Sequence, residues 1–193
     1  MYSVLDQLLL PGEEAHIIER LSGKEMDFRS TITKIRQHQP EVLVVFLLAG
    51  QIAEFYRQLA DQKLSIPTFG TNLFECRSEI TRANGAMDGA IWANPLVSSQ
   101  FQAQYLAKFG EQSQISWAAL AYEFANLTSR IVETDPKITT GADLLFRLSQ
   151  PSNYSGFAVG EFSAVNSSDI PYYRFKLTAK TVKNGEVIQT DVN

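Results

Sequence analysis

The side chains that could carry out catalysis are few and scattered along this 193-residue sequence. Its two histidines, His16 and His38, fall in a predicted strand and at a predicted helix end, with no serine-hydrolase or nucleotide-binding motif in the chain. Cys76 is the single cysteine, so the chain can form neither an internal disulfide nor a cysteine-based zinc site. We therefore expect no enzyme, no cofactor and no metal site. A small α/β enzyme that uses Cys76 or Glu123 remains an alternative of a different class.

Two short loops offer groups that suit binding better than catalysis. Residues 48–51 (Leu-Ala-Gly-Gln) and 70–74 (Gly-Thr-Asn-Leu-Phe) each follow a predicted strand and lead into a predicted helix. Each loop combines a glycine, where backbone can approach a ligand closely, with short polar side chains and amides at a helix start. In an open parallel sheet, ligands bind beyond the carboxyl ends of the strands. The loops predict a small-molecule site, although ordinary strand-to-helix connections share this composition.

The elements that position these loops alternate between helix and strand. The pattern predicts a helix over 28–38 with Asp27 as its N-cap, and then a strand over 42–48. That strand is apolar at consecutive positions, which is typical of a strand covered on both faces. A second helix to about Lys63 and a short strand over 66–69 follow. Connections of a few residues between such elements are typical of a parallel sheet flanked by helices.

The rest of the chain extends this pattern and then changes character. Before the first helix, the sequence predicts the end of another helix over 2–10 and a strand over 15–21; after it come helices over 74–83, 99–109, 115–133 and 142–148 and a strand over 89–93. Beyond Pro151, residues 157–162 and 172–182 alternate like antiparallel strands, and Asn184-Gly185 predicts a hairpin turn into 186–190. We expect an α/β protein with a β-rich tail.

Charge and hydropathy exclude several kinds of partner. The net charge is −4 and no cluster of Lys and Arg is present, so a nucleic-acid partner is not expected. The longest apolar run, over 42–49, is far shorter than the roughly 20 residues of a membrane helix. The first residues, MYSVLDQLLLPGEE, lack the basic start and cleavage site of a signal peptide. The protein is therefore either cytosolic or exported by a signal outside this chain.

The stretch DFRSTITKIRQHQPEVLVVFLLAG (27–50) resembles a segment of the periplasmic solute-binding proteins of branched-chain amino acid ABC transporters. In that family an Asp-Phe opens a helix, and Lys-Ile precedes Pro-Asp and a buried strand; Asp27-Phe28, Lys34-Ile35 and Pro40-Glu41 stand in those places. The similarity continues, in the family's order, through QIAEFYRQLADQKLSIPTFGT, GAMDGAIWANP, AALAYEFANLTSRIVE and FAVGEFSAVNSSDIPYYRFKLTAKTVKNGEV.

The resemblance implies a type I periplasmic-binding fold, in which two α/β lobes close on a small polar solute, such as an amino acid or amide, and deliver it to an ABC transporter permease. Residues 1–112 would form the second, ligand-binding lobe, a three-layer αβα unit with a mostly parallel sheet. Residues 113–156 would be helices that belong with a first lobe missing from this chain, and 157–193 crossover strands and a hairpin. The implied location is the periplasm or the extracellular face. The ligand-sensing domain of a signalling receptor with the same fold is the alternative.

By position, the resemblance places ligand contacts at Ala49, Gly50, Gln51, Thr71, Asn72 and Phe74. In amino-acid receptors of this type the second loop often holds an acid that pairs with the ligand's ammonium group. Here Asn72 stands in that place, with Glu75 nearby. Because an ammonium buried without a counter-charge is costly, an amino-acid ligand is in doubt. With the first lobe missing, the apolar helices over 115–133 and 142–148 are expected to drive homo-oligomerisation or domain swapping.

Overall fold

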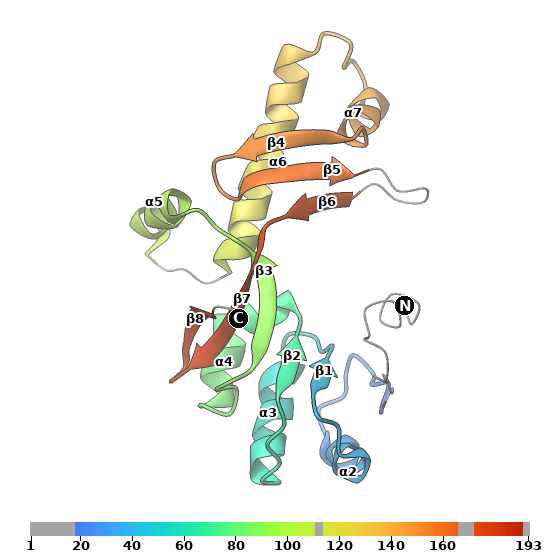
Figure 1. Cartoon of the computed structure of the whole chain (residues 1–193), viewed down its shortest axis with the longest axis vertical. Coiled ribbons are helices and arrows are strands. Elements are labelled where there is room, and N and C mark those ends of the chain that lie inside the picture. The colour runs from blue at the N-terminus through green and yellow to red at the C-terminus, as the bar shows by residue number, and fades with distance from the viewer. Residues whose placement is uncertain (1–17, 111–113, 166–171, 191–193) are drawn as a thin grey trace.

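A computed structural model describes residues 18–110, 114–165 and 172–190 and arranges them in two units joined by two connecting segments (Figure 1). We call the part around the five-stranded sheet the large-sheet unit and the part around the three-stranded sheet the small-sheet unit. The chain passes from the first to the second after strand β3, and it returns between strands β6 and β7. The two units have separate hydrophobic cores.

The large-sheet unit is an α/β layer structure. Its elements are α2 (Arg29–His38), β1 (Leu43–Val45), α3 (Gln51–Asp61), β2 (Thr68–Gly70), η1 (Asn72–Glu75), α4 (Arg77–Ala83), β3 (Ile91–Pro95), β7 (Leu177–Lys183) and β8 (Glu186–Thr190). The sheet order is β1-β2-β3-β7-β8, with β1, β2 and β3 parallel and the last two strands antiparallel. The predicted α/β class, with a mostly parallel sheet and an antiparallel tail, is confirmed.

The small-sheet unit contains α5 (Ser99–Phe109), α6 (Ile115–Thr134), α7 (Gly141–Leu148), β4 (Ser152–Gly156), β5 (Gly160–Val165) and β6 (Tyr172–Phe175). Its strands form an antiparallel sheet in the order β4-β5-β6. Local signals set the helix starts: the Ser98 hydroxyl caps α5, and Thr140 and Asp143 form a reciprocal capping box at the start of α7. The Asp143 pKa is lowered by these hydrogen bonds, the largest effect coming from Thr140.

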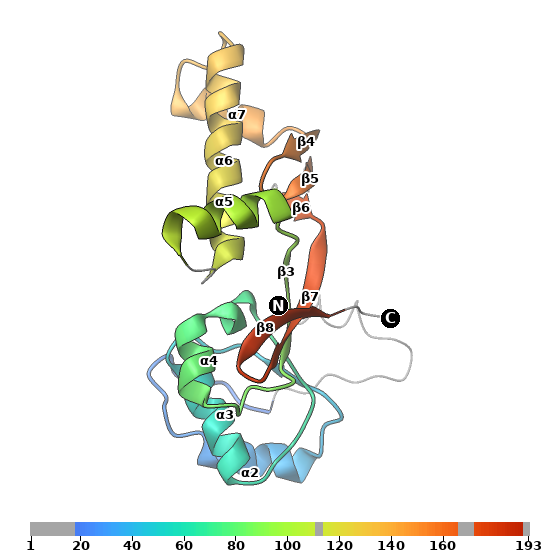
Figure 2. The same ribbon diagram turned by 90° about the vertical axis from the view of Figure 1, so that its left-hand side faces the viewer.

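Aromatic rings form the centre of the large-sheet core. Phe28, Phe55, Tyr56, Phe74 and Trp92 follow one another at centroid separations of 5.5, 5.7, 5.7 and 6.3 Å. All five side chains are buried. They join α2, α3 and the loop after β2 to the inward face of β3, so that α3 and α4 lie on one side of the sheet (Figure 2).

The strand predicted over 42–48 is covered on one face only, so the prediction of burial on both faces is wrong for the described residues. Val45 and Leu47 point into the core, whereas Val44, Phe46 and Leu48 are exposed. The alternation follows from the two-residue repeat of a strand, and α3 and α4 cover only the inward side.

Several boundaries also differ from the predictions. Phe28, not Asp27, is the N-cap of α2; the Asp27 carboxylate accepts the Arg29 N–H at 3.2 Å and pairs with the Arg29 guanidinium at 2.6 Å. Residues 18–21 form no strand, and residues 2–10 and 15–17 lie outside the described residues. The strand predicted over 157–162 is a turn followed by β5. The Asn184-Gly185 hairpin is confirmed, with positive φ at both residues.

Candidate functional site

The two predicted loops meet at one edge of the large sheet. Val45 of β1 is in register with Gly70 of β2, so the segments that follow these residues leave neighbouring strands at the same end. That end is the carboxyl edge of the parallel strands, and it faces the small-sheet unit (Figures 1 and 2). The structure therefore brings the predicted loops together and sets them at the junction of the two units.

The first loop uses most of its polar groups internally. The Gln51 amide donates to the carbonyl oxygens of Ser22 and Glu25, at 3.0 and 2.8 Å, and accepts the Leu48 N–H at 3.1 Å. Gln51 is buried, while Ala49 is exposed. The Gln51 side chain thus anchors residues 22–25 against the end of β1.

A buried carboxylate occupies the start of α3, where the sequence predicted free amides. The two oxygens of Glu79 accept the N–H groups of Gly50 and Ala53, at 2.8 and 2.9 Å. Arg82 donates to the same carboxylate at 3.3 Å. The residue lies in α4, 29 positions beyond Gly50 in the sequence, so no local motif marks it. In this arrangement the Gly50 amide already has an anionic partner.

The second loop keeps two polar groups without partners. The Thr71 hydroxyl is buried and forms no hydrogen bond, and the half-buried Asn72 amide forms none within the described residues. Phe74, by contrast, is fully buried and packs over Gly70, between Tyr56 and Trp92. Thr71 and Asn72 therefore remain candidates for ligand contact, and Phe74 lies in the core.

Glu75, the only acid in this loop, already has a positively charged partner in Lys180. Its carboxylate accepts the Lys180 ammonium at 2.8 Å and the Ser116 hydroxyl at 3.2 Å, and the Asn94 amide donates to it as well. Lys180 also lies 3.1 Å from the Ser116 hydroxyl. Glu75, Asn94 and Ser116 are buried, and the Lys180 side chain is 12% exposed.

We call these four residues the junction cluster, because they come from η1, β3, α6 and β7 and link the two units. Sequence reasoning missed it. The sequence contains one sign of this cluster, namely the position of Lys180. Lys180 is in register with the buried Trp92 and therefore lies on the inward face of the sheet, where a lysine needs a charged partner.

Comparison with known proteins identifies the architecture. No protein-family model matches the sequence, and no curated protein matches it. Among solved structures, the leucine-binding protein LivK of Thermotoga maritima superposes with a TM-score of 0.74 at 16% identity, covering 87% of this chain and 49% of that one. The chain has the type I periplasmic-binding fold.

Two further structures agree at the level of fold. The LivJ substrate-binding protein of Streptococcus pneumoniae, in complex with isoleucine, gives a TM-score of 0.66 at 18% identity over 86% of this chain and 50% of that one. A solute-binding protein of R. palustris, in complex with benzoate, gives 0.60 at 17% identity, over 88% and 47%. The predicted resemblance is confirmed, and the chain spans about half the length of the structures that it matches.

Two of the side chains that the sequence offered as possible catalytic groups, Glu123 and His38, have hydrogen-bond partners within the protein. Glu123 of α6 is buried, and its carboxylate accepts N–H groups of Phe157, Ala158 and Val159, between β4 and β5. His38 is exposed, with Nδ1 2.8 Å from the Lys34 carbonyl oxygen, and His16 lies outside the described residues.

Cys76 follows the second loop. Burial acts to raise the pKa of its thiol, but hydrogen bonds with Ser78 and Gln114, at 3.2 and 3.5 Å, outweigh burial and lower it. No histidine is among the hydrogen-bond partners of Sγ. Over 18–110, 114–165 and 172–190, no three His, Cys, Asp or Glu side chains gather as a metal site.

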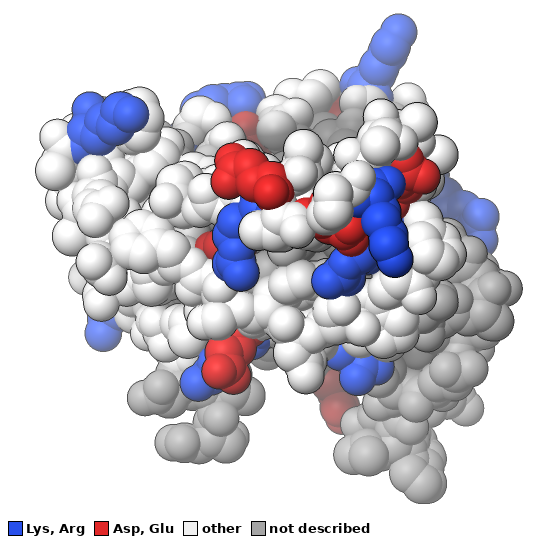
Figure 3. Space-filling view, turned by 90° about the horizontal axis from the view of Figure 1, so that it is seen from above, with Lys and Arg blue, Asp and Glu red and all other residues white. Residues whose placement is uncertain are grey.

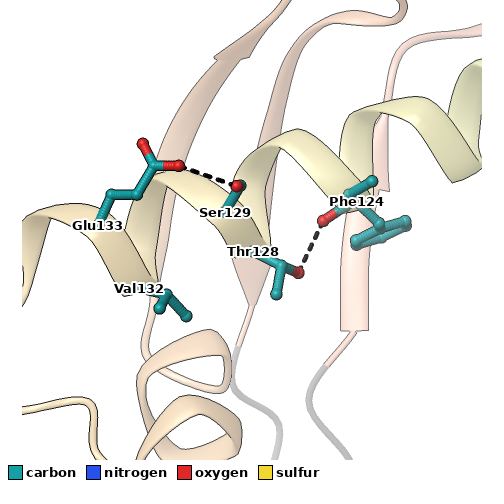
Figure 4. Close-up of a pocket in the computed structure, with 6 residues that line it drawn as sticks. Phe124, Thr128, Ser129, Val132 and Glu133 are labelled. Carbon is teal, nitrogen blue, oxygen red and sulfur yellow. Dashed lines mark hydrogen bonds between the residues drawn. The ribbon is translucent and has the colours of Figure 1, made fainter.

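A pocket of about 570 Å³ lies away from the predicted loops, along one face of α6. Figure 4 shows its lining residues Phe124, Thr128, Ser129, Val132 and Glu133 on this single helix, where Thr128 donates to the Phe124 carbonyl oxygen at 2.7 Å and Ser129 donates to Glu133 at 3.1 Å. Its polar groups are therefore bonded to one another. No helix in the described part of the chain has the length and apolar character needed to cross a membrane.

Proposed function

We propose that this chain forms one side of the ligand cleft of an extracytoplasmic solute-binding protein, which passes a small polar solute to an ABC transporter permease. One observation carries the proposal: the two strand-end loops lie at the same sheet edge and face a second unit across two connecting segments. The matched structures, including those in complex with isoleucine and with benzoate, support it at the level of fold. The proposed location is the periplasm or the extracellular face. A ligand-sensing domain of a signalling receptor is the alternative.

The loop chemistry limits the class of solute. Thr71 and Asn72 offer a hydroxyl and an amide, groups that bind neutral polar atoms or a carboxylate. The one carboxylate in that loop, Glu75, already pairs with Lys180. An ammonium placed here would lack a counter-charge, which is costly in a closed cleft. We therefore propose that amides and carboxylates bind at this edge in preference to amino acids.

Titration of the ¹⁵N-labelled chain by two-dimensional NMR tests this function. The probes are butyramide, benzoate and isoleucine at millimolar concentrations, because one side of a cleft offers only part of the contacts. We expect butyramide or benzoate to shift the amide signals of residues 49–51 and 71–72, and Asn72→Ala to abolish these shifts. The exposed Asn153 of β4 provides the matched control, Asn153→Ala. Shifts confined to the α6 pocket, or no shifts with any probe, would exclude the proposed site.

The exposed side of α7 supports a further part of the proposal, namely association with another protein surface. Leu145 and Phe146 are 65% and 69% exposed, and Val132 of α6 is exposed as well. Figure 3 views the molecule from the small-sheet end: positive and negative side chains are mixed there and large areas carry no charge. Such a surface favours apolar association over charge-driven binding. Light scattering tests it, and a monodisperse monomer would contradict self-association.

A further inference from the structure

The carboxylate of the second loop is occupied by an ammonium group that the chain itself supplies. Lys180 Nζ donates to Glu75 Oε1 at 2.8 Å, although the two residues lie 105 positions apart in the sequence. The Ser116 hydroxyl and the Asn94 amide contact Oε2. Both oxygens of Glu75 are therefore in use, and a second cation finds no free acceptor there while Lys180 is in place.

The short helix η1 brings this carboxylate close to a proposed ligand contact. Asn72 is the first residue of η1 and Glu75 is the last. In a 3-10 helix, residues three positions apart lie on the same side, about 6 Å from each other along the axis. Asn72 is half-buried, whereas Glu75 is buried. A cation held by Glu75 thus lies within about one helical turn of Asn72.

The register of the sheet sets Lys180 at the level of the same loop. Lys180 of β7 is paired with Trp92 of β3, and Trp92 is paired with Gly70 of β2, the residue before Thr71. Residues paired in this way have their side chains on the same face of the sheet, and Trp92 is fully buried on that face. The sheet therefore holds the Lys180 ammonium beside the second loop.

The burial of the pair makes it selective. The side chains of Glu75 and Lys180 are 5% and 12% exposed, so salt and water screen the two charges little. Stability alone does not account for such a pair, because well-packed apolar side chains of similar size are often as stabilising. A tethered ammonium does, however, compete strongly against a free one, since tethering gives it a high effective concentration. Opposition to the wrong ligand is a common source of specificity.

We propose that Lys180 is a specificity-determining residue of the ligand cleft: its ammonium fills a cation site on Glu75 and so excludes solutes that carry an ammonium group. This role rests on the proposed function, which makes the second loop part of a cleft. Without the lysine side chain, the Glu75 carboxylate and the Ser116 hydroxyl remain as acceptors, and Asn94 still orients the carboxylate. The site then binds a primary ammonium ion from solution.

Chemical rescue of Lys180→Ala tests this specificity. The substitution removes Cγ, Cδ, Cε and Nζ, and n-propylammonium chloride supplies the same atoms. At millimolar concentrations and constant ionic strength, n-propylammonium should raise the Tm of the variant by about 3 °C or more and shift the ¹⁵N amide signals of residues 72–75. The wild type should not respond. Lys183→Ala, at an exposed position of the same strand, is the matched control and should behave like the wild type.

Two comparisons separate ammonium binding from the filling of a cavity. 1-Propanol has the shape of n-propylammonium without its charge, and its effect on Lys180→Ala should be at least threefold smaller. The double variant Lys180→Ala with Glu75→Gln should not respond to n-propylammonium, because the carboxylate is gone. Equal effects of the two probes, or a response that persists in the double variant, would overturn the proposal.

The test remains decisive if Lys180→Ala is unfolded in plain buffer. In that case n-propylammonium should restore the helical circular dichroism signal, and the absence of any recovery would overturn the proposal. The proposed function is tested separately, by butyramide and the wild type. Binding of butyramide to the wild type, combined with no rescue of Lys180→Ala, would leave the proposed function in place and remove the role of Lys180.

Discussion

Glu79 of α4 is buried, and its carboxylate lies against the start of α3. There it accepts the backbone N–H groups of Gly50, the N-cap, and Ala53. A glutamine at this position keeps one acceptor oxygen but turns an NH2 group toward the second N–H. It also removes the charge that pairs with Arg82. We predict that Glu79→Gln lowers the free energy of unfolding by about 1–3 kcal/mol, as measured by urea denaturation.

The control for this substitution is Glu161→Gln. Glu161 lies in β5 and is exposed, and its carboxylate forms no hydrogen bond or ion pair within the described residues. Its substitution should change the free energy of unfolding by less than about 0.5 kcal/mol. If both variants unfold at the same urea concentration, the Glu79 carboxylate does not stabilise α3.

Tyr56 gives the large-sheet core a dependence on alkaline pH. Its hydroxyl is buried 2.5 Å from the Thr68 hydroxyl, and burial raises its pKa above the ordinary value of 10.0. The folded state thus favours the protonated phenol. The resulting stability is complete below pH 10 and is lost as the pH rises further, because the unfolded chain ionises first. We predict that Tyr56→Phe reduces the fall in Tm between pH 9.5 and 11.5.

Tyr122→Phe is the matched control, because Tyr122 is 42% exposed. Its substitution should leave the alkaline fall in Tm unchanged. An identical pH dependence for the wild type and for Tyr56→Phe would show that other groups cause the alkaline loss.

At the scale of elements, Glu123 of α6 holds the turn between β4 and β5 through three backbone N–H groups. Gly156 lies directly against this carboxylate, and an added Cβ would overlap it. We predict that Gly156→Ala costs about 2–4 kcal/mol, because it pushes a buried charge away from its donors. Thermal unfolding followed by circular dichroism measures the loss.

The chain offers a matched glycine for comparison. Gly141 begins α7, has a negative φ and faces open space, so Gly141→Ala should be neutral or stabilise the protein by up to about 1 kcal/mol. If both alanine variants unfold at the wild-type temperature, the contact between α6 and the β4–β5 turn carries no stability.

The same elements show what the sequence can and cannot predict. Helix α5 begins and ends where predicted, because Ser98 caps it and Gly110 ends it in the left-handed region. The prediction of a strand over 157–162 is wrong because the turn at 157–159 is made of apolar residues, which are typical of strands. These residues can form a turn because Glu123, from a distant helix, accepts their N–H groups. Short-range signals therefore set most element boundaries, and long-range contacts set the exceptions.

The candidate site shows the same division between what short-range signals predict and what long-range contacts decide. The position of both loops at one sheet edge followed from the alternation of helix and strand, and the register of β1 and β2 agrees with it. The sequence did not predict that the Gln51 side chain bonds to Ser22 and Glu25, or that Glu79 binds the Gly50 amide. These partners lie 26 to 29 positions away in the sequence. Sequence thus located the loops, while tertiary contacts decide which groups remain free for a ligand.

At the scale of the whole molecule, two connecting segments and the junction cluster link the units. Lys180 belongs to β7, the strand that follows the returning segment, Ser116 belongs to α6, and Glu75 belongs to the loop that carries Thr71 and Asn72. The cluster thus connects the proposed ligand loop to both units through charged hydrogen bonds. Because such bonds are stronger than neutral ones, we expect the cluster to fix the relative orientation of the units.

Breaking the Glu75–Lys180 pair tests this role. Lys180→Met leaves a buried carboxylate without its counter-charge, and Glu75→Gln leaves a nearly buried ammonium, so each should cost about 3 kcal/mol. The double variant should cost less than the sum of the two, because it removes both charges together. Lys183→Met, on an exposed position of the same strand, should be neutral. Native-state hydrogen exchange should locate the loss at the start of α6 and in η1, where the two units meet. Additive costs, or faster exchange spread evenly over both units, would show that the pair does not hold the contact with Ser116 of α6.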